Sequence, residues 1–334
     1  MRSPLLDTPG AVAAETPDAD VAGHYGDPFA EQRAFLTGEA MVDRSNREVV
    51  RISGPDRLSW LNSLSSQKLD DLKPGQATQT LLLDAQGRVE HHLTLVDDGE
   101  AVWAHVEPGT AAELVAFLDK MRFMLRVEVA DVTSGYAVVS VVSVVSGDDG
   151  ARFTLPEGAI LVGDDVLLPR DLLAGRLGGL RLAGLWAYEA LRIEDHRPRL
   201  GFETDHKTIP HEVGWIGTAL HLSKGCYKGQ ETVARVHNLG HPPRRLVFLH
   251  LDGSADTLPG HGAPVLHDGV EVGFVGSSAR HHELGPIALA VVKRTVPVDA
   301  TLSAGEVAAS QEVVVPPDAG RNVQIDPSLR RRIR

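Results

Sequence analysis

Residues 48–131 alternate between strand-like and helix-like patterns, in the order expected of an α+β unit. The β-branched run EVVRIS at 48–53 predicts a strand. Gly54-Pro55-Asp56 then predicts a helix start, because proline in the first turn of a helix loses no hydrogen bond. The runs TQTLLLD, RVEHHLTLV and AVWAHV follow, separated by the Asp- and Gly-containing turns of a meander.

A second helix is predicted after this meander. Thr110 and Glu113 have the spacing of a capping box, and apolar residues repeat at helical spacing from Leu114 to Met121. The alternating run FMLRVEV at 123–129 predicts a closing strand. Strand, helix, meander, helix and strand together predict a complete α+β unit.

The rest of the chain predicts two more units. YAVVSVVSVV, from Tyr136, predicts a buried strand, and GLWAYEALRIED predicts a well-buried helix near 184–195. Short strand-like runs after residue 243, with an Asp268-Gly269 hairpin turn, predict a small antiparallel barrel. The predicted divisions are a poorly ordered acidic arm (1–35), an N-terminal α+β unit (36–135), a second α+β unit (136–240), a C-terminal antiparallel β-barrel (241–320) and a basic tail (321–334).

Composition excludes several classes of protein. The net charge of -12 argues against extensive direct nucleic-acid binding, which needs a basic surface. No apolar run approaches the roughly 20 residues of a membrane span, and no signal peptide is evident, so a cytoplasmic location is expected. A single cysteine excludes an internal disulfide and any site made of several thiolates.

The histidines do not predict a metal site. Eleven of the 15 lie between residues 196 and 282. His237 and His241 are four apart, but Gly240 and Pro242 interrupt the helix that would align them. Histidines in loops of an acidic protein explain the clustering better, and no metal ligands are assigned.

The string KGCYKGQETVAR, residues 224–235, is the strongest functional signal. Gly225 and Gly229 bracket Cys226, and a helix is predicted from Gly229 onward. Lys224, Lys228 and the helix start favour a thiolate, so a reactive cysteine with a lowered pKa is expected. A buried structural cysteine is the alternative, but the two lysines make an apolar surrounding improbable.

Glu194, near the end of an otherwise apolar helix, is the second signal. A carboxylate there is either a solvated helix end or a buried acceptor with a specific partner. A pterin ring presents two adjacent donors that one carboxylate can accept side by side. The residues alone leave both alternatives open.

KGCYKGQETVAR resembles the K-G-C-[FY]-x-G-Q-E signature of the YgfZ family of folate-binding proteins, which is related to the glycine-cleavage T-protein, a tetrahydrofolate-dependent aminomethyltransferase. LRIEDHRPRLGFETDHKTIPHE and the stretch SGPDRLSWLNSLSSQKLDDLKPGQATQTLLLDAQGRVE are similar to shared patterns of both. The resemblance implies a three-domain ring with tetrahydrofolate or a related folate in the middle. It places Glu194 on the pterin-binding acid and Cys226 at the functional centre. The other implied cofactor-binding residues are Lys224, Tyr227, Gln230, Glu231 and Arg235.

Two functions follow from the resemblance. The first is a folate-binding accessory protein that supports assembly or repair of iron–sulfur clusters in client enzymes, including enzymes that modify tRNA. The alternative is a folate-dependent aminomethyltransferase or demethylase of one-carbon metabolism. T-proteins carry a catalytic aspartate where this chain has Lys68, and an ammonium cannot do that carboxylate's work. The cysteine signature therefore favours the accessory function at this stage.

Overall fold

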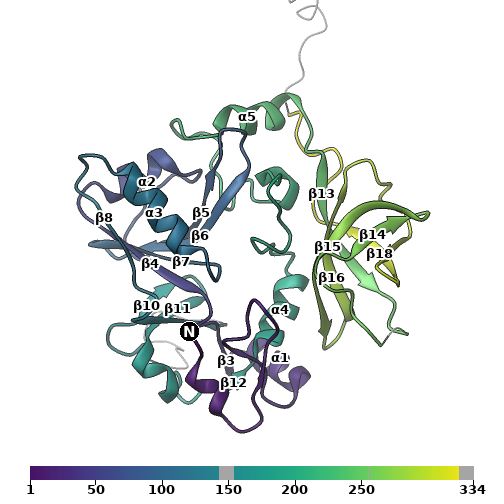
Figure 1. The fold of residues 1–334 in the computed structure, drawn as a ribbon, viewed down its shortest axis with the longest axis horizontal. Helices are drawn as coiled ribbons and strands as arrows, with labels where there is room; N and C mark the ends of the chain where they lie inside the picture. Colours follow the sequence, from purple (N-terminus) through teal and green to yellow (C-terminus); the bar gives the residue numbers. More distant parts are fainter. Residues whose placement is uncertain (143–153, 255, 323–334) are drawn as a thin grey trace, which may run out of the picture.

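The computed structural model describes residues 1–142, 154–254 and 256–322. Two mixed units and a barrel lie around a central region, with α4 (Leu185–Glu194) between them (Figure 1). The protein therefore has the predicted α+β architecture with a C-terminal antiparallel barrel. Most of the predicted basic tail, and the end of the run that starts at Tyr136, lie outside the described residues.

The first sheet is made entirely from residues 48–131. Its strand order is β5-β6-β7-β4-β8, and every pair is antiparallel. Two helices pack on one face through an apolar core that includes Trp60, Leu114 and Leu118. The elements are β4 (Glu48–Ser53), α2 (Arg57–Leu64), β5 (Ala77–Leu83), β6 (Val89–Asp97), β7 (Ala101–Val106), α3 (Ala111–Met121) and β8 (Glu128–Asp131).

Two local predictions for this unit differ from the structure. Thr110 is the N-cap of α3, but its hydroxyl donates to the Glu107 carbonyl and makes no capping bond to the helix. The closing strand begins at Glu128 and not at Phe123. Phe123 and Met124 lie in a turn with 85% and 97% of their surface exposed, because Phe123 has a left-handed backbone (φ 47°) that ends the helix.

The second sheet combines segments from both sides of the first unit. Its order is β10-β11-β9-β3-β12, and β3, which precedes the first unit, pairs with β9 and β12. The predicted boundary at residue 36 therefore places β3 in a different unit from the sheet it joins. The strands are β3 (Ala40–Asp43), β9 (Tyr136–Val141), β10 (Ile160–Val162), β11 (Asp165–Pro169) and β12 (Arg181–Ala183); the 3-10 helix η2 (Arg170–Gly175) follows β11.

The first 35 residues are folded, which corrects the predicted poorly ordered arm. They form η1 (Pro4–Asp7), the pair β1 (Val12–Ala13) and β2 (Ala22–His24), and helix α1 (Pro28–Leu36). Leu5 and Phe35 are buried against later elements, and Asp18 is buried in an ion pair. This order comes from distant partners, which local periodicity does not reveal.

The segment after α4 is irregular, as predicted, with only η3 (Pro210–Val213) before α5 (Gln230–Leu239). The closed barrel then runs β13-β16-β15-β14-β17-β18, and the Asp268-Gly269 turn joins β14 to β15. Its strands are β13 (Arg244–Leu251), β14 (Pro264–His267), β15 (Val270–His281), β16 (Gly285–Lys293), β17 (Leu302–Ala304) and β18 (Val307–Val313). Among the described helices, none combines the length and apolar character needed to cross a bilayer.

Candidate folate site

A cavity of about 820 Å³ lies where the three parts of the protein meet. Strands β5, β6 and β7 of the first unit, the end of α4 and the loop after it line the cavity. Val314, directly after the last barrel strand, completes the wall. The polar and aromatic residues that line the cavity include Arg44, Arg47, His92, His105, Glu107, Asp165, Tyr188, Arg192, Glu194, Asp195, Arg197, Arg199 and Trp215.

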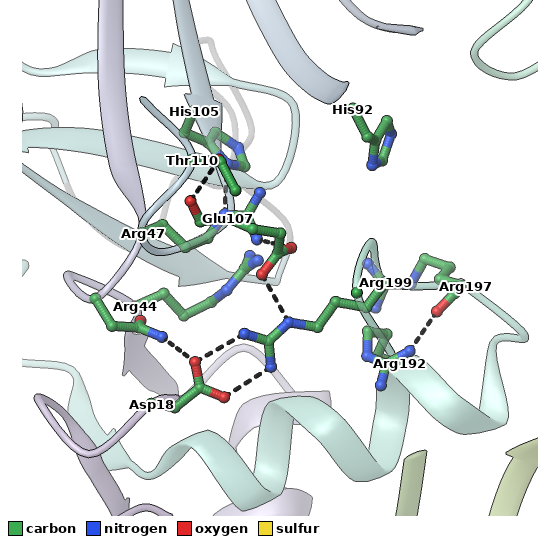
Figure 2. Close-up of polar contacts among 12 residues, drawn as sticks. Asp18, Arg44, Arg47, His92, His105, Glu107, Thr110, Arg192, Arg197 and Arg199 are labelled. Atoms are coloured by element: carbon green, nitrogen blue, oxygen red, sulfur yellow. Dashed lines mark hydrogen bonds and ion pairs between the residues drawn. The ribbon is translucent and has the colours of Figure 1, made fainter. Parts of the chain in front are cut away.

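Buried arginine–carboxylate pairs hold the cavity floor (Figure 2). The Arg199 guanidinium donates to both oxygens of Asp18, at 2.8 and 2.7 Å, and through Nε to Glu107 at 2.8 Å. Arg47 donates to the other oxygen of Glu107. Burial alone would raise the pKa of Glu107, but the two guanidinium groups outweigh it and hold that pKa below its ordinary value.

A second group of pairs surrounds Asp165. Arg44 lies 3.0 Å from Asp165 Oδ1, and His105 Nε2 lies 2.9 Å from Oδ2. His105 Nδ1 accepts a hydrogen bond from Arg47 Nε at 2.8 Å, so the neutral ring carries its proton on Nε2. Burial, reinforced by the neighbouring Arg47, lowers the pKa of His105 to about 4. The ring therefore stays neutral at physiological pH and connects the two ion pairs.

Glu194 differs from these carboxylates because it has no arginine or lysine partner among the described residues. It ends α4, lines the cavity and has 39% of its side chain exposed. Its Oε2 lies 3.1 Å from His281 Nε2 at the end of β15. A carboxylate without a cationic neighbour in a cavity can accept a pair of donors from a ligand.

Aromatic side chains form another part of the wall. The Trp215 ring lies 4.7 Å from the His92 ring, measured between centroids, and both residues line the cavity. Tyr188, on α4, has the Arg44 guanidinium 3.9 Å from its ring centroid. Aromatic side chains beside a carboxylate that has no arginine or lysine partner suit a planar heterocycle with adjacent donors.

A second cavity of about 700 Å³ lies between the N-terminal segment, α4 and the barrel. Phe29, Trp186, Phe202 and His261 line it. Arg199 lines both cavities, so its ion pairs form part of the wall between them.

The structure separates the cysteine signature from the central cavity. Of the predicted site residues, only Glu194 lines that cavity, and none of the others lines the second one. Cys226, Glu231 and Arg235 are exposed, Gln230 is half-buried at the first turn of α5, and Tyr227 is buried in the apolar core.

The two signature lysines have partners other than the cysteine. The Lys224 ammonium donates to the backbone carbonyls of Asn62, Ser65 and Gln67, and burial lowers its pKa to about 8. The Lys228 ammonium lies 3.3 Å from Glu90. Lys224 therefore joins the signature segment to the first unit.

Gly229 has a similar structural role. It has a left-handed backbone (φ 83°), and a Cβ there would lie 2.5 Å from the Asp84 carbonyl oxygen and 2.9 Å from Gly87 Cα. Only glycine allows the start of α5 to approach the β5–β6 turn so closely. Gly229 thus serves a close contact between two parts of the chain, whereas a Cβ at Gly225 would meet no atom within 4 Å.

The sequence did not reveal the buried ion pairs that lie in and beside the central cavity. Asp18, Arg44, Arg47, Glu107 and Arg199 lie outside the recognised motifs or inside segments taken as loops. The available signal was a charged residue next to a mostly apolar run, such as Glu107 after the strand-like run AVWAHV, and that pattern equally suits a solvated turn.

Comparisons with known proteins agree with this architecture. Residues 8–143 match the GCVT N-terminal domain, and residues 244–330 match the glycine cleavage T-protein C-terminal barrel domain. The crystal structure of glycine cleavage system aminomethyltransferase T from Bartonella henselae superposes with a TM-score of 0.75 at 18% identity, covering 96% of this chain and 98% of that one. The protein therefore has a GcvT-like multi-domain fold.

Curated relatives are similar over most of their length. A chloroplastic transferase of Arabidopsis thaliana is 26% identical over 344 residues, covering 90% of this chain and 76% of the relative. An aminomethyltransferase of Synechococcus sp. (strain CC9902) is 28% identical over 305 residues, covering 78% of this chain and 82% of the relative.

Proposed function

We propose that this protein binds tetrahydrofolate in the central cavity and acts as a folate-dependent one-carbon transferase of the aminomethyltransferase type. The observation that carries the proposal is Glu194, a carboxylate that lines the cavity without an arginine or lysine partner. The adjacent ring N–H and amino group of a pterin would donate to its two oxygens.

The cavity has the size and walls that such a ligand needs. Its volume of about 820 Å³ lies within the range of small-molecule sites, roughly 300–1,000 Å³. Tyr188, Trp215 and its neighbour His92 contribute aromatic rings to the lining, and Arg197, with 44% of its side chain exposed, offers a cation for a ligand carboxylate. The names of the aminomethyltransferase relatives support the same ligand class.

Transfer by this chain has to differ from the T-protein reaction in one respect. Lys68, which stands where T-proteins have their catalytic aspartate, does not line the cavity, and its ammonium pairs with Asp71. A cationic one-carbon group needs a nearby anion. Among the residues lining the cavity, Asp164 and Asp195 are the aspartates not paired with a buried arginine, so they are the candidates.

Titration with tetrahydrofolate, followed by tryptophan emission, tests the proposal because Trp215 lines the cavity. We expect saturable quenching in the wild type and little signal in W215F. E194Q should weaken binding roughly 5- to 150-fold, because the amide places a donor against a pterin donor at a cost of about 1–3 kcal/mol.

E312Q is the matched control. Glu312 also accepts from a histidine, His250, but on the outside of the barrel. E312Q should bind folate like the wild type. A wild-type protein that shows no saturable binding would refute the proposal, and equal affinities of E194Q and E312Q would refute the role of Glu194.

A second candidate is the accessory role in iron–sulfur protein assembly, and the exposure of Cys226 favours it. Cys226 is exposed and lines neither cavity, so a partner protein can reach it. C226S should then bind folate normally but fail to support cluster-dependent enzymes in cells, since a hydroxyl has little affinity for iron. Full support by C226S would eliminate this candidate.

A further inference from the structure

His281, in the C-terminal barrel, lies next to Glu194 but does not itself line the cavity. It is the last residue of β15, and 1% of its side chain is exposed. Its Nε2 lies 3.1 Å from Glu194 Oε2, within ion-pair distance, but forms no hydrogen bond of good geometry with any described residue. The contact joins the barrel to the end of α4.

The backbone around His281 fixes which nitrogen carries the proton. Nδ1 accepts hydrogen bonds from the backbone N–H groups of Glu283 and Leu284, at 3.2 and 3.1 Å. A nitrogen that accepts cannot carry the proton, so the neutral ring has its N–H on Nε2, toward Glu194. The turn between β15 and β16 thereby sets His281 as a donor.

Gln32 of the N-terminal helix α1 holds the same strand end in place. Its side-chain amide donates to the Arg280 carbonyl at 2.8 Å and accepts from the His282 backbone N–H at 2.9 Å. Gln32 is 1% exposed, so both bonds are made away from water. The residues on either side of His281 are therefore attached to α1, which anchors the backbone that carries the imidazole.

We infer that His281 is a positioning residue for folate binding: its Nε2 N–H, 3.1 Å from Glu194, donates to that carboxylate when the pterin is bound and holds it in the orientation that a pterin requires. The inference rests on the proposed function. A carboxylate oxygen has two lone pairs, so Oε2 can accept from His281 and from the ligand at once. Without the histidine, Glu194 samples other rotamers and binding has to order it first.

H281N tests this inference, because the asparagine oxygen can replace Nδ1 as acceptor in the turn while the donor to Glu194 is lost. We expect a melting temperature close to wild type and roughly tenfold weaker tetrahydrofolate binding. H250N is the matched control, since it removes the equivalent His250–Glu312 contact on the barrel surface, and it should leave the affinity unchanged.

A double-mutant cycle separates this role from a general structural one. If His281 acts through Glu194, H281N should weaken folate binding no further in the E194Q background. Q32L releases the strand end without altering the histidine. It should lower the folate affinity of the wild type but have no further effect in the E194Q background. Wild-type affinity in H281N, or losses that multiply in the double variant, would overturn the inference; absence of folate binding by the wild type would instead refute the proposed function.

Discussion

Removing the Arg199 guanidinium should break ion pairs with two buried carboxylates at once, Asp18 and Glu107. The guanidinium makes three short bonds, two to Asp18 and one to Glu107, and its side chain is 7% exposed. Breaking a buried pair by removing one partner costs about 3–5 kcal/mol. Arg47 still holds Glu107 and Asn46 still donates to Asp18, so we expect R199M to lose about 3 kcal/mol, the lower end of that range.

The assay is chemical denaturation at pH 7, compared with R197M as the control. Arg197 is near Arg199, but its side chain is 44% exposed and its pair with Asp195 is exposed as well, so its loss should cost about 1 kcal/mol at most. D18N should restore part of the stability of R199M, because it removes the buried charge that Arg199 neutralises in the wild type. A loss below about 1 kcal/mol in R199M, or strict additivity with D18N, would refute the reasoning.

Three further predictions concern pH, the signature glycine and the cysteine. The pKa of His105, lowered from 6.5 to about 4 by burial, means that the unfolded chain binds more protons between these values, so stability falls as the pH drops through this window. At pH 5 the lowered pKa of His105 destabilises the folded protein by about 2 kcal/mol. From pH 7 to pH 5, the unfolding free energy of H105Q should therefore fall by about 2 kcal/mol less than that of the wild type. G229A should lose more than about 2 kcal/mol in the same denaturation assay, because the new Cβ meets the Asp84 carbonyl at 2.5 Å in a left-handed backbone; wild-type stability would contradict this. Alkylation of Cys226 should proceed at the same rate with and without saturating tetrahydrofolate, because the thiol lies outside the cavity, whereas protection by folate would place it in the site.

The strands of the first unit could be predicted because local composition decides them. Residues 48–53 form the predicted strand, and the Asp268-Gly269 turn forms the predicted hairpin. The N-terminal segment could not be predicted in this way. Asp18 is buried only because Arg199 binds it from 181 residues away, and no local pattern records such a partner.

The candidate site was predictable only in part. Glu194 was singled out by its place at the end of an apolar helix and by resemblance, and it lines the cavity. The signature around Cys226 was interpreted as chemistry, whereas Lys224 and Gly229 make contacts that join α5 and its loop to the first unit. A glycine-containing motif can arise from a close backbone contact as well as from a reactive group, and only the three-dimensional structure distinguishes the two.

The placement of β3 has a consequence for how the chain folds as it is synthesised. Val42 in β3 pairs with Ser140 on one side and Ala183 on the other, and both partners are synthesised much later than Val42. The sheet of residues 48–131 contains all its own strands, so it can fold while the ribosome is still adding the second unit. The N-terminal segment then waits beside a finished layer with β3 unpaired. During that interval the unpaired edges of β3 are open to chaperones and proteases.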